Sequence, residues 1–341
     1  MKSVYKDPYF IGIIILIIII FIIIYLVRKS TTSTSPTTPT SPTTPTSPTT
    51  STNSLKQIIF GVDLSNNIPS SVYWKSINST PLPLKQSLTN YPNGCFMINI
   101  NSSGIIVGIV IDDTQHNIPV YWKSIDSYPI KLELLPNATK QGNDSSASSI
   151  NNMGIIVGCT YKIPCYWPSY DKTPKILSLG VYISGEATCI NNMGIIIGNL
   201  KDSNNRMIPV YWTSIDATPL RLLGSDSNYN CISINDNGII VGSKFDSVNF
   251  ISIPIYWSSI NGNPSPLLYD SYSSAIAYGI NNSGIIVGNV LNKNSSSSSS
   301  TSPNLNIQRP NIAVYWPSIN SNPILLPVDN NEKYMVSSIS N

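Results

Sequence analysis

Residues 150–158 read Ile-Asn-Asn-Met-Gly-Ile-Ile-Val-Gly, and residues 165–169 read Cys-Tyr-Trp-Pro-Ser. Near-copies of both stretches recur along the chain. The run Gly-Ile-Ile-(Val/Ile)-Gly begins at Gly104, Gly154, Gly194, Gly238 and Gly284. Every tryptophan follows a tyrosine, at Trp74, Trp122, Trp167, Trp212, Trp257 and Trp316. The period of about 40 to 50 residues is typical of propeller blades and related arrays.

Each repeat is predicted to form four short strands. The first ends in Ile-Asn, as at 147–151, and the second is the Gly-Ile-Ile-Val-Gly run. The third is Pro-Val-Tyr-Trp, as at 119–122, and the fourth carries Pro then Leu, as at 129–135. Because the second strand is continuously apolar rather than alternating, we expect both of its faces to be buried between neighbouring sheets. Blades packed side by side have this property.

The connection between the first and second strands starts with Asn and ends with Gly, as in 151–154. An Asn side chain can bond nearby backbone groups, and a Gly can take the positive φ that a bulged hairpin turn requires. A calcium loop is the alternative, since Asn and Asp supply oxygen ligands. Asp236 is the only carboxylate in these turns, so we expect no metal.

The Tyr-Trp pair has a fixed sequence environment. A Ser lies two residues after each Trp and a Pro lies seven after it, in all six units. This spacing predicts one repeated turn into the outer strand. We expect the Tyr-Trp pair to pack blade against blade rather than to stack on a ligand.

The two ends of the repeat array complement each other. The first unit starts at 58–61 with a second-strand sequence, and no first strand precedes it. After the sixth unit closes near Pro327, residues 334–341 resemble a first strand. An open stack would leave both edges exposed, whereas a closed ring pairs them. The sequence therefore predicts an all-β, six-bladed β-propeller of four-stranded blades, with Val336 to Ile339 innermost in the blade of Trp74.

Four segments are expected along the chain. Residues 1–9 are a short N-terminal segment, and 10–27 are an uncharged run that reads as a transmembrane helix, a signal anchor. A cleaved signal peptide is the alternative, but no small-x-small site follows the run. Residues 28–54 form a disordered Ser/Thr/Pro-rich stalk, which in polyproline II could extend about 70 Å. The propeller occupies 55–341.

Composition excludes several classes of function. Only 11% of the 341 residues are charged and the net charge is +3, so the chain lacks the basic stripe of a nucleic-acid binder. The five cysteines are an odd number, which leaves at least one thiol unpaired or paired with another chain. Cys159 and Cys165 either form a disulfide between neighbouring strands or remain as two buried thiols.

No catalytic constellation is visible. His116 is the only histidine, and it lies in a polar loop near Asp112 and Asp113 without a triad or further zinc ligands. Carboxylates are too sparse to predict a propeller glycosidase. No Gly-rich phosphate loop leads from a strand into a helix. We therefore expect a protein without catalytic, metal-binding or cofactor-binding residues.

The connection between the second and third strands is the variable part of each repeat, and in a propeller all these loops emerge on one face. Such a face suits recognition, because packing fixes the strands behind it. The alternative is that these loops drifted without constraint. The candidate binding residues there are Asp112, Asp113, His116, Lys201, Asp202, Arg206, Lys244, Asp246, Lys293 and Arg309.

Asn-x-Ser/Thr sites permit N-glycosylation but do not argue for it, since about eight would occur by chance in this composition. The sites are Asn78, Asn101, Asn137, Asn143, Asn281 and Asn294.

The pattern of a small residue at 147, Ile-Asn at 150–151, Gly154 and Val-Gly at 157–158, followed by an aromatic-Trp strand, resembles the HAF-type extracellular repeat. The resemblance covers 58–341. It implies a β-propeller-like array of a secreted or surface protein and carries no established catalytic residues. The family usually shows Ala-Phe-Leu-Trp and a Leu-Gly-rich segment, where this chain has Val-Tyr-Trp and Pro-Leu. An Ile- and Asn-rich version on a membrane anchor also resembles surface proteins of amoeba-infecting giant viruses.

These features together predict a single-pass membrane protein whose C-terminal domain lies outside the cytosol, on a cell or virion surface. It would be a non-catalytic display protein that binds an unknown protein or glycan, and no nucleic acid. One alternative is a propeller hydrolase acting on glycans. Another is a structural envelope or coat component.

Overall fold

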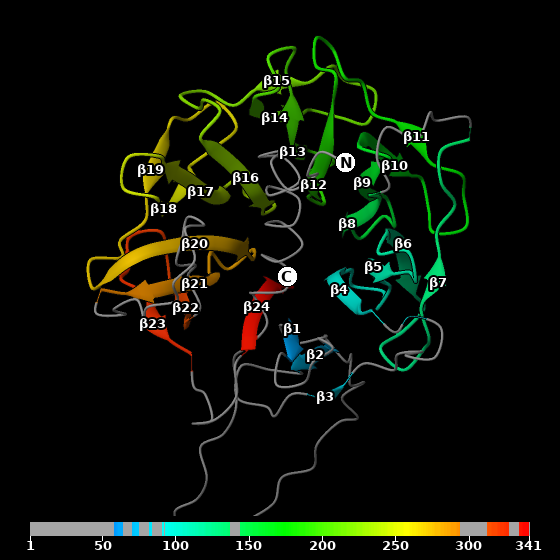
Figure 1. The fold of residues 1–341 in the computed structure, drawn as a ribbon, viewed down its shortest axis with the longest axis horizontal. Helices are drawn as coiled ribbons and strands as arrows, with labels where there is room; N and C mark the ends of the chain where they lie inside the picture. Colours follow the sequence, from blue (N-terminus) through cyan, green and yellow to red (C-terminus); the bar gives the residue numbers. More distant parts are fainter. Residues whose placement is uncertain are drawn as a thin grey trace, which may run out of the picture.

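The computed structural model describes residues 58–63, 70–74, 82–83, 91, 93–136, 144–293, 312–326 and 334–340. The predicted membrane helix at 10–27 and the stalk at 28–54 lie outside this part of the chain. Within it, no helix is long and apolar enough to cross a membrane. The described residues form short strands, antiparallel within each blade, and their connections, arranged as six blades around a central channel (Figure 1).

Each blade consists of four strands, which follow one another from the channel outward. Blade 1 contains β24 (Tyr334–Ile339), β1 (Ile59–Asp63), β2 (Ser70–Trp74) and β3 (Leu82–Pro83). Blade 2 contains β4 (Cys95–Ile100), β5 (Ile106–Ile111), β6 (Asn117–Trp122) and β7 (Ile130–Lys131). Blade 3 contains β8 (Ser146–Ile150), β9 (Ile156–Thr160), β10 (Ile163–Trp167) and β11 (Lys175–Ile176). Blade 4 contains β12 (Ser184–Ile190), β13 (Ile196–Lys201), β14 (Met207–Trp212) and β15 (Leu220–Arg221). Blade 5 contains β16 (Tyr229–Ile234), β17 (Ile240–Asp246), β18 (Ile251–Trp257) and β19 (Pro264–Pro266). Blade 6 contains β20 (Tyr272–Ile280), β21 (Ile286–Asn292), β22 (Ile312–Trp316) and β23 (Ile324–Leu325).

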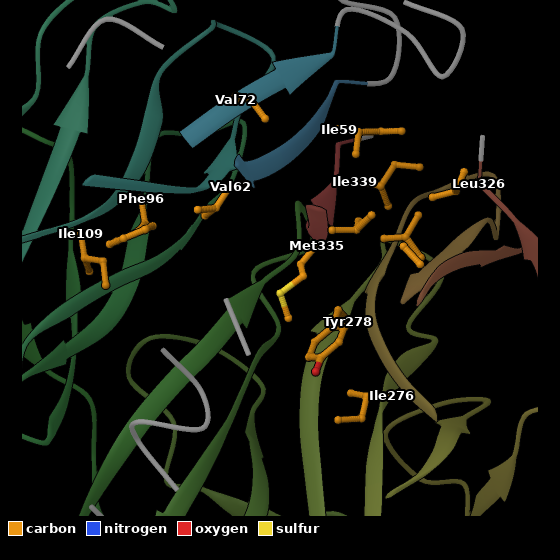
Figure 2. Packing of buried hydrophobic residues seen from close by; sticks show 13 residues of the cluster. Ile59, Val62, Val72, Phe96, Ile109, Ile276, Tyr278, Leu326, Met335 and Ile339 are labelled. Carbon is orange, nitrogen blue, oxygen red and sulfur yellow. The ribbon is translucent and has the colours of Figure 1, made fainter. Parts of the chain in front are cut away.

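The ring closes as the sequence predicts. The C-terminal strand β24 pairs antiparallel with β1, with Ile339 opposite Ile59 and Val336 opposite Gly61. It is thus the innermost strand of blade 1. On its other side it contacts blade 6, where Tyr278 lies beside Met335 in one apolar cluster (Figure 2). Buried contacts on both sides therefore hold the end of the chain in the ring.

The two glycines of the repeat motif have different structural roles. Gly154 has φ 84°, and nothing lies within 4 Å of the position its Cβ would take, so its backbone conformation is what selects glycine. Gly158 has an ordinary φ, but a Cβ there would lie 2.0 Å from the Ser146 carbonyl oxygen. The inner strand β8 has a bulge between Ala147 and Ser149, which shifts its register against β9. The second glycine leaves room for this irregular strand.

Blade-to-blade packing uses the predicted Tyr-Trp pair, because adjacent residues of a strand point to opposite faces. In blade 3, Trp167 is fully buried against blade 2, and its Nε1 donates to the Glu133 carbonyl at 2.8 Å. Tyr166 packs against blade 4. Trp212, Trp257 and Trp316 make the same kind of bond to the preceding blade. The expectation of packing rather than ligand stacking is confirmed for these residues.

The prolines of the third strand lie inside it rather than opening it. Pro119 pairs with Ile109 in the middle of the β5–β6 ladder. Its carbonyl accepts the Leu132 amide from the outer side. In an antiparallel strand the N–H and C=O of one residue point the same way, so the donor that proline lacks would face this outer side. There the fourth strand is only two residues long, and a missing donor is tolerated.

Candidate functional site

The propeller has two distinct ends. The Asn-Gly turns between first and second strands form one end, the turn face. The connections between second and third strands, such as 112–116 in blade 2 and 202–206 in blade 4, form the other end, the loop face. Antiparallel strands place these two sets at opposite ends of every blade. The candidate binding residues of these connections therefore share the loop face.

Three carboxylates among the predicted binding residues accept hydrogen bonds from groups of the loop in which each lies. Asp112 Oδ1 accepts the backbone amides of Thr114 at 2.9 Å and His116 at 2.8 Å. Burial alone would raise the pKa of Asp112, but these bonds outweigh it and lower the pKa. Asp202 holds Arg206 through its backbone amide at 2.9 Å, and this bond is the main cause of a lowered pKa of Asp202. Asp246 is likewise bonded within its own loop. These loops are thus internally braced.

The other predicted residues occupy varied surroundings on this face. Arg206 forms an ion pair with Asp202 at 2.8 Å. His116 Nδ1 lies 2.7 Å from Thr114 Oγ1. Lys244 Nζ lies 5.1 Å from the centre of the Tyr229 ring. Asp113 is exposed, Lys201 is half-buried, Lys293 bonds to the Asp270 carbonyl, and Arg309 lies outside the described residues. The structure does not gather these residues into one cluster.

The loop face is uneven in height. In blade 3 the hairpin ends in a two-residue turn, Tyr161 and Lys162, with φ 52° and 63°. In blade 5 the pairing continues to Asp246 opposite Ile251. The loop beyond this pair exposes Val248 at 82% and Phe250 at 46%. Blade 4 therefore lies between blade 3, which has a short turn on this face, and blade 5, which has a longer hairpin with exposed apolar side chains.

Glu186 is the functional candidate that reasoning from the sequence missed. It is the only charged residue in the six inner strands, which comparison of the repeats position by position would have found. It lies near the loop-face end of β12 in blade 4. The bond from Gly185 N–H to the Lys162 carbonyl, at 2.7 Å, joins this strand to the tight turn of blade 3. No hydrogen bond or ion pair joins the Glu186 carboxyl to any other described side chain.

The electrostatic surroundings of Glu186 favour its protonated form. Burial raises the pKa of Glu186 to about 7, and the Asp144 carboxylate raises it while Lys162 lowers it. Burial also raises the pKa of Asp144, against the opposing charges of Lys162 and His116. Asn117 Nδ2 donates to Asp144 Oδ1 at 3.3 Å. A carboxyl that titrates near neutral pH can exchange a proton or accept a hydrogen bond from a hydroxyl or an amine.

Metal binding has no support from the described ranges, in which no three His, Cys, Asp or Glu side chains come together. The disulfide alternative for Cys159 and Cys165 is not observed either. Cys159 pairs with Pro164 across the β9–β10 hairpin, so Cys165, the next residue, points to the opposite face. Both thiols are free and buried, and burial raises the pKa of Cys159 to about 12. The alternative of two buried thiols is the one observed.

Two of the glycosylation sites are inaccessible. Asn101 is 5% exposed and Asn281 is 1% exposed. Each side-chain oxygen accepts a backbone amide of its own turn, at 3.0 Å from Ile105 and Ile285 respectively. In the folded propeller neither side chain is therefore accessible for attachment of a glycan. Asn78, Asn137, Asn143 and Asn294 lie outside the described residues.

Comparison with known proteins identifies the fold and nothing finer. No family model and no curated protein matches the chain. Among solved structures, a chain of a nidogen/laminin complex is similar, with a TM-score of 0.52 and 6% identity over 83% of this chain and 97% of that one. The chain has a β-propeller fold. A putative TolB from Agrobacterium tumefaciens has a TM-score of 0.44 and 9% identity, over 62% of this chain and 87% of that one. TolB from Acinetobacter baumannii has a TM-score of 0.45 and 9% identity, over 69% and 61%.

Proposed function

We propose that this propeller is a membrane-anchored, non-catalytic surface protein that binds a protein or a glycan through its loop face. The observation that carries the proposal is the contrast between the repeated strands and the divergent loop face. Strands, Asn-Gly turns and Tyr-Trp packing recur from blade to blade, whereas the loops range from the turn at Tyr161 to the tall hairpin of blade 5. Braced, divergent loops on a rigid scaffold are typical of recognition surfaces.

Blade 4 is the proposed centre of the contact. Glu186 lies at its inner strand, and the exposed apolar side chains of Val181 and Ile183 precede that strand. Phe250 stands on the neighbouring blade 5, held edge-on against Phe245 with ring centres 6.4 Å apart. A partner would cover these apolar groups and offer a hydroxyl or an amine to Glu186, a combination that fits interface composition.

Anchoring and location rest on the sequence. The apolar run at 10–27 and the stalk at 28–54 are proposed to hold the propeller away from the membrane, on a cell or virion surface. The HAF-type resemblance and the resemblance to giant-virus surface proteins point the same way. A structural coat role is the competing proposal, and abundance in purified particles would favour it.

The test uses the full chain displayed on cells and probed with protein and glycan arrays. For any ligand found, Phe250→Ser and Glu186→Gln should each weaken binding about tenfold or more. Met193→Ser is the matched control, because Met193 is 71% exposed but lies on the turn face. Binding that survives both loop-face changes, or that is lost equally in the control, would overturn the proposal.

A hydrolase acting on glycans is the second candidate, favoured by the buried Glu186 carboxyl, whose pKa burial and the Asp144 carboxylate raise. Glycosidases use two carboxyl groups, one of them with a raised pKa as the general acid. Release of dye from a panel of nitrophenyl glycosides would support this candidate, provided that Glu186→Gln abolishes the release. Turnover that Glu186→Gln leaves unchanged would point to a contaminant.

A further inference from the structure

A cavity of about 300 Å³ lies at the turn-face end of the central channel. It is separate from the loop face, because its walls come from the ends of the inner strands and from the turns that follow them. All six blades contribute, from Asn99 and Asn101 in blade 2 to Ser338 of β24 and Ser340, which follows that strand. Its volume is at the lower limit of the range of about 300 to 1,000 Å³ that is usual for small-molecule sites.

The wall of this cavity carries no charge. Asparagine, serine and isoleucine side chains make up nearly all of it, together with Cys189. Burial raises the pKa of Cys189 and keeps its thiol neutral. A charged ligand would lose its hydration here without gaining a counter-charge, which costs several kcal/mol. The wall therefore selects a neutral molecule.

The side-chain polar atoms of the wall differ in whether they already have hydrogen-bond partners in the protein. Asn101 Oδ1 already accepts two backbone amides of its own turn, and its Nδ2 donates to the Asn151 carbonyl at 3.2 Å. Asn99 and Asn152 are different. Their Oδ1 atoms accept the amides of Ile150 at 3.4 Å and Ser102 at 2.9 Å, while their NH₂ groups bond to no other described residue. Two residues of the cavity wall, in adjacent blades, thus carry amide donors that no described residue accepts.

These donors stand beside apolar groups. Ile100 and Ile150, each next to an Asn, also line the cavity. A ligand that fits has several oxygen acceptors around a ring whose C–H faces are apolar, which is the chemistry of a sugar. We propose that the turn-face cavity binds one neutral sugar residue, with Asn99 Nδ2 and Asn152 Nδ2 donating to its oxygens. This site is independent of the loop-face function.

The test uses the full chain in a detergent without sugar headgroups, with binding followed by saturation-transfer NMR and titration calorimetry. Methyl glucoside and N-acetylglucosamine are the neutral probes, and glucuronate and glucosamine are their charged counterparts. A single sugar should bind with a Kd on the order of 1 mM, given its small number of atoms. The charged probes should bind at least about tenfold more weakly.

Three Asn→Leu variants separate the site from its surroundings. Asn99→Leu and Asn152→Leu should each weaken binding of the neutral sugar about tenfold, since each change removes an amide donor that would bond to a sugar oxygen. Asn152 is exposed at the cavity mouth, so its variant should keep the parent melting temperature even if Asn99→Leu does not. Asn237→Leu is the control, because Asn237 lies on the same face outside the cavity. The proposal would be overturned if neither neutral probe bound, or if the charged probes bound as tightly as the neutral ones. It would also be overturned if Asn237→Leu weakened binding as much as the two cavity variants.

Discussion

The amide of Ile58 donates to Ser340 Oγ at 2.8 Å across a separation of 282 residues. The backbone amide of Ser340 returns a bond to the Ile58 carbonyl at 3.0 Å. In the other blades an Asn and the residue four positions later make the same pair of contacts within one turn, as Asn151 does with Ile155. The ring is thus closed by a turn whose two halves come from the beginning and the end of the repeat array.

Deleting residues 333–341 should therefore destabilise the propeller strongly. The deletion removes three buried apolar side chains, Met335, Val336 and Ile339. At about 1.5 to 3 kcal/mol each, their loss should lower the melting temperature by more than about 10 °C or cause aggregation. Scanning calorimetry of fragment 55–341 with and without the deletion measures this. A shortened fragment that melts like its parent would show that β24 does not hold the ring together.

The two motif glycines should respond differently to alanine. Gly158→Ala places a Cβ against the Ser146 carbonyl, so we expect a loss of about 3 kcal/mol or more in the free energy of unfolding. Gly154→Ala meets only the backbone penalty of a positive φ, about 1 kcal/mol. Urea unfolding of both variants gives the comparison. Equal losses at the two positions would contradict the separate roles assigned to them.

The buried turn asparagine should be important for stability. Asn191 Oδ1 accepts the amides of Met193 and Ile195, and its Nδ2 donates to the Asn235 carbonyl of the next blade at 3.0 Å. Asn191→Ala leaves these groups unsatisfied, which should cost about 2 to 4 kcal/mol. Asn204→Ala, on an exposed loop, should stay within about 0.5 kcal/mol of the parent. Chemical denaturation that fails to separate the two variants would refute the role of the turn.

Stability should depend on pH through Glu186. Its pKa is raised in the folded protein from 4.5 to about 7, so between these values the folded state holds a proton that the unfolded state has released. The contribution is complete below the unfolded pKa and is lost as the pH rises through about 7. Glu186→Gln mimics the protonated form and should be about 1 to 3 kcal/mol more stable than the parent near pH 8, yet similar to it near pH 4.

The control for the pH experiment is Glu133→Gln, which changes an exposed glutamate of blade 2. The difference between parent and Glu186→Gln should grow with pH, and the difference for the control should not. Urea unfolding across the pH range provides both curves. Parallel curves for parent and Glu186→Gln would mean that Glu186 keeps an ordinary pKa, with Asp144 and Lys162 balancing each other.

The anchoring prediction concerns the residues before the propeller. The full-length protein should remain with membranes through an alkaline carbonate wash, because residues 10–27 are long and apolar enough to span the hydrocarbon core. A fragment that begins at Leu55 should be soluble. Release of the full-length protein by the wash would remove the basis for a single-pass anchor.

Features that repeat were predictable from the sequence. The Asn-Gly turn, the buried second strand and the opposite faces of Tyr166 and Trp167 follow from local chemistry and a two-residue period. Closure by β24 followed from one missing strand at the start and one extra at the end. These inferences depend on patterns that recur in several blades, so each copy supports the others.

Features that depend on three-dimensional contacts, rather than on a recurring sequence pattern, were not predictable. The need for Gly158 arises from the bulge in β8, which only the paired strands reveal. From the sequence, Asp112 is expected to be an exposed charge, whereas in the structure its carboxylate accepts hydrogen bonds from backbone amides of its own loop. The pKa of Glu186 is raised by burial and by Asp144 of the neighbouring blade 3, while Lys162 of that blade lowers it. Cys159 and Cys165 are close in sequence, but strand geometry separates them.

Blade 1 differs from the others in how it would carry mechanical load. It contains both the first described strand of the propeller and the last, so β1 lies between β24 and β2. A pull on the chain upstream of Ile58 enters the protein through β1 and strains these two ladders before any other blade. If a partner grips the loop face while the N-terminus is held in a membrane, the tension passes through the seam closed by Ser340.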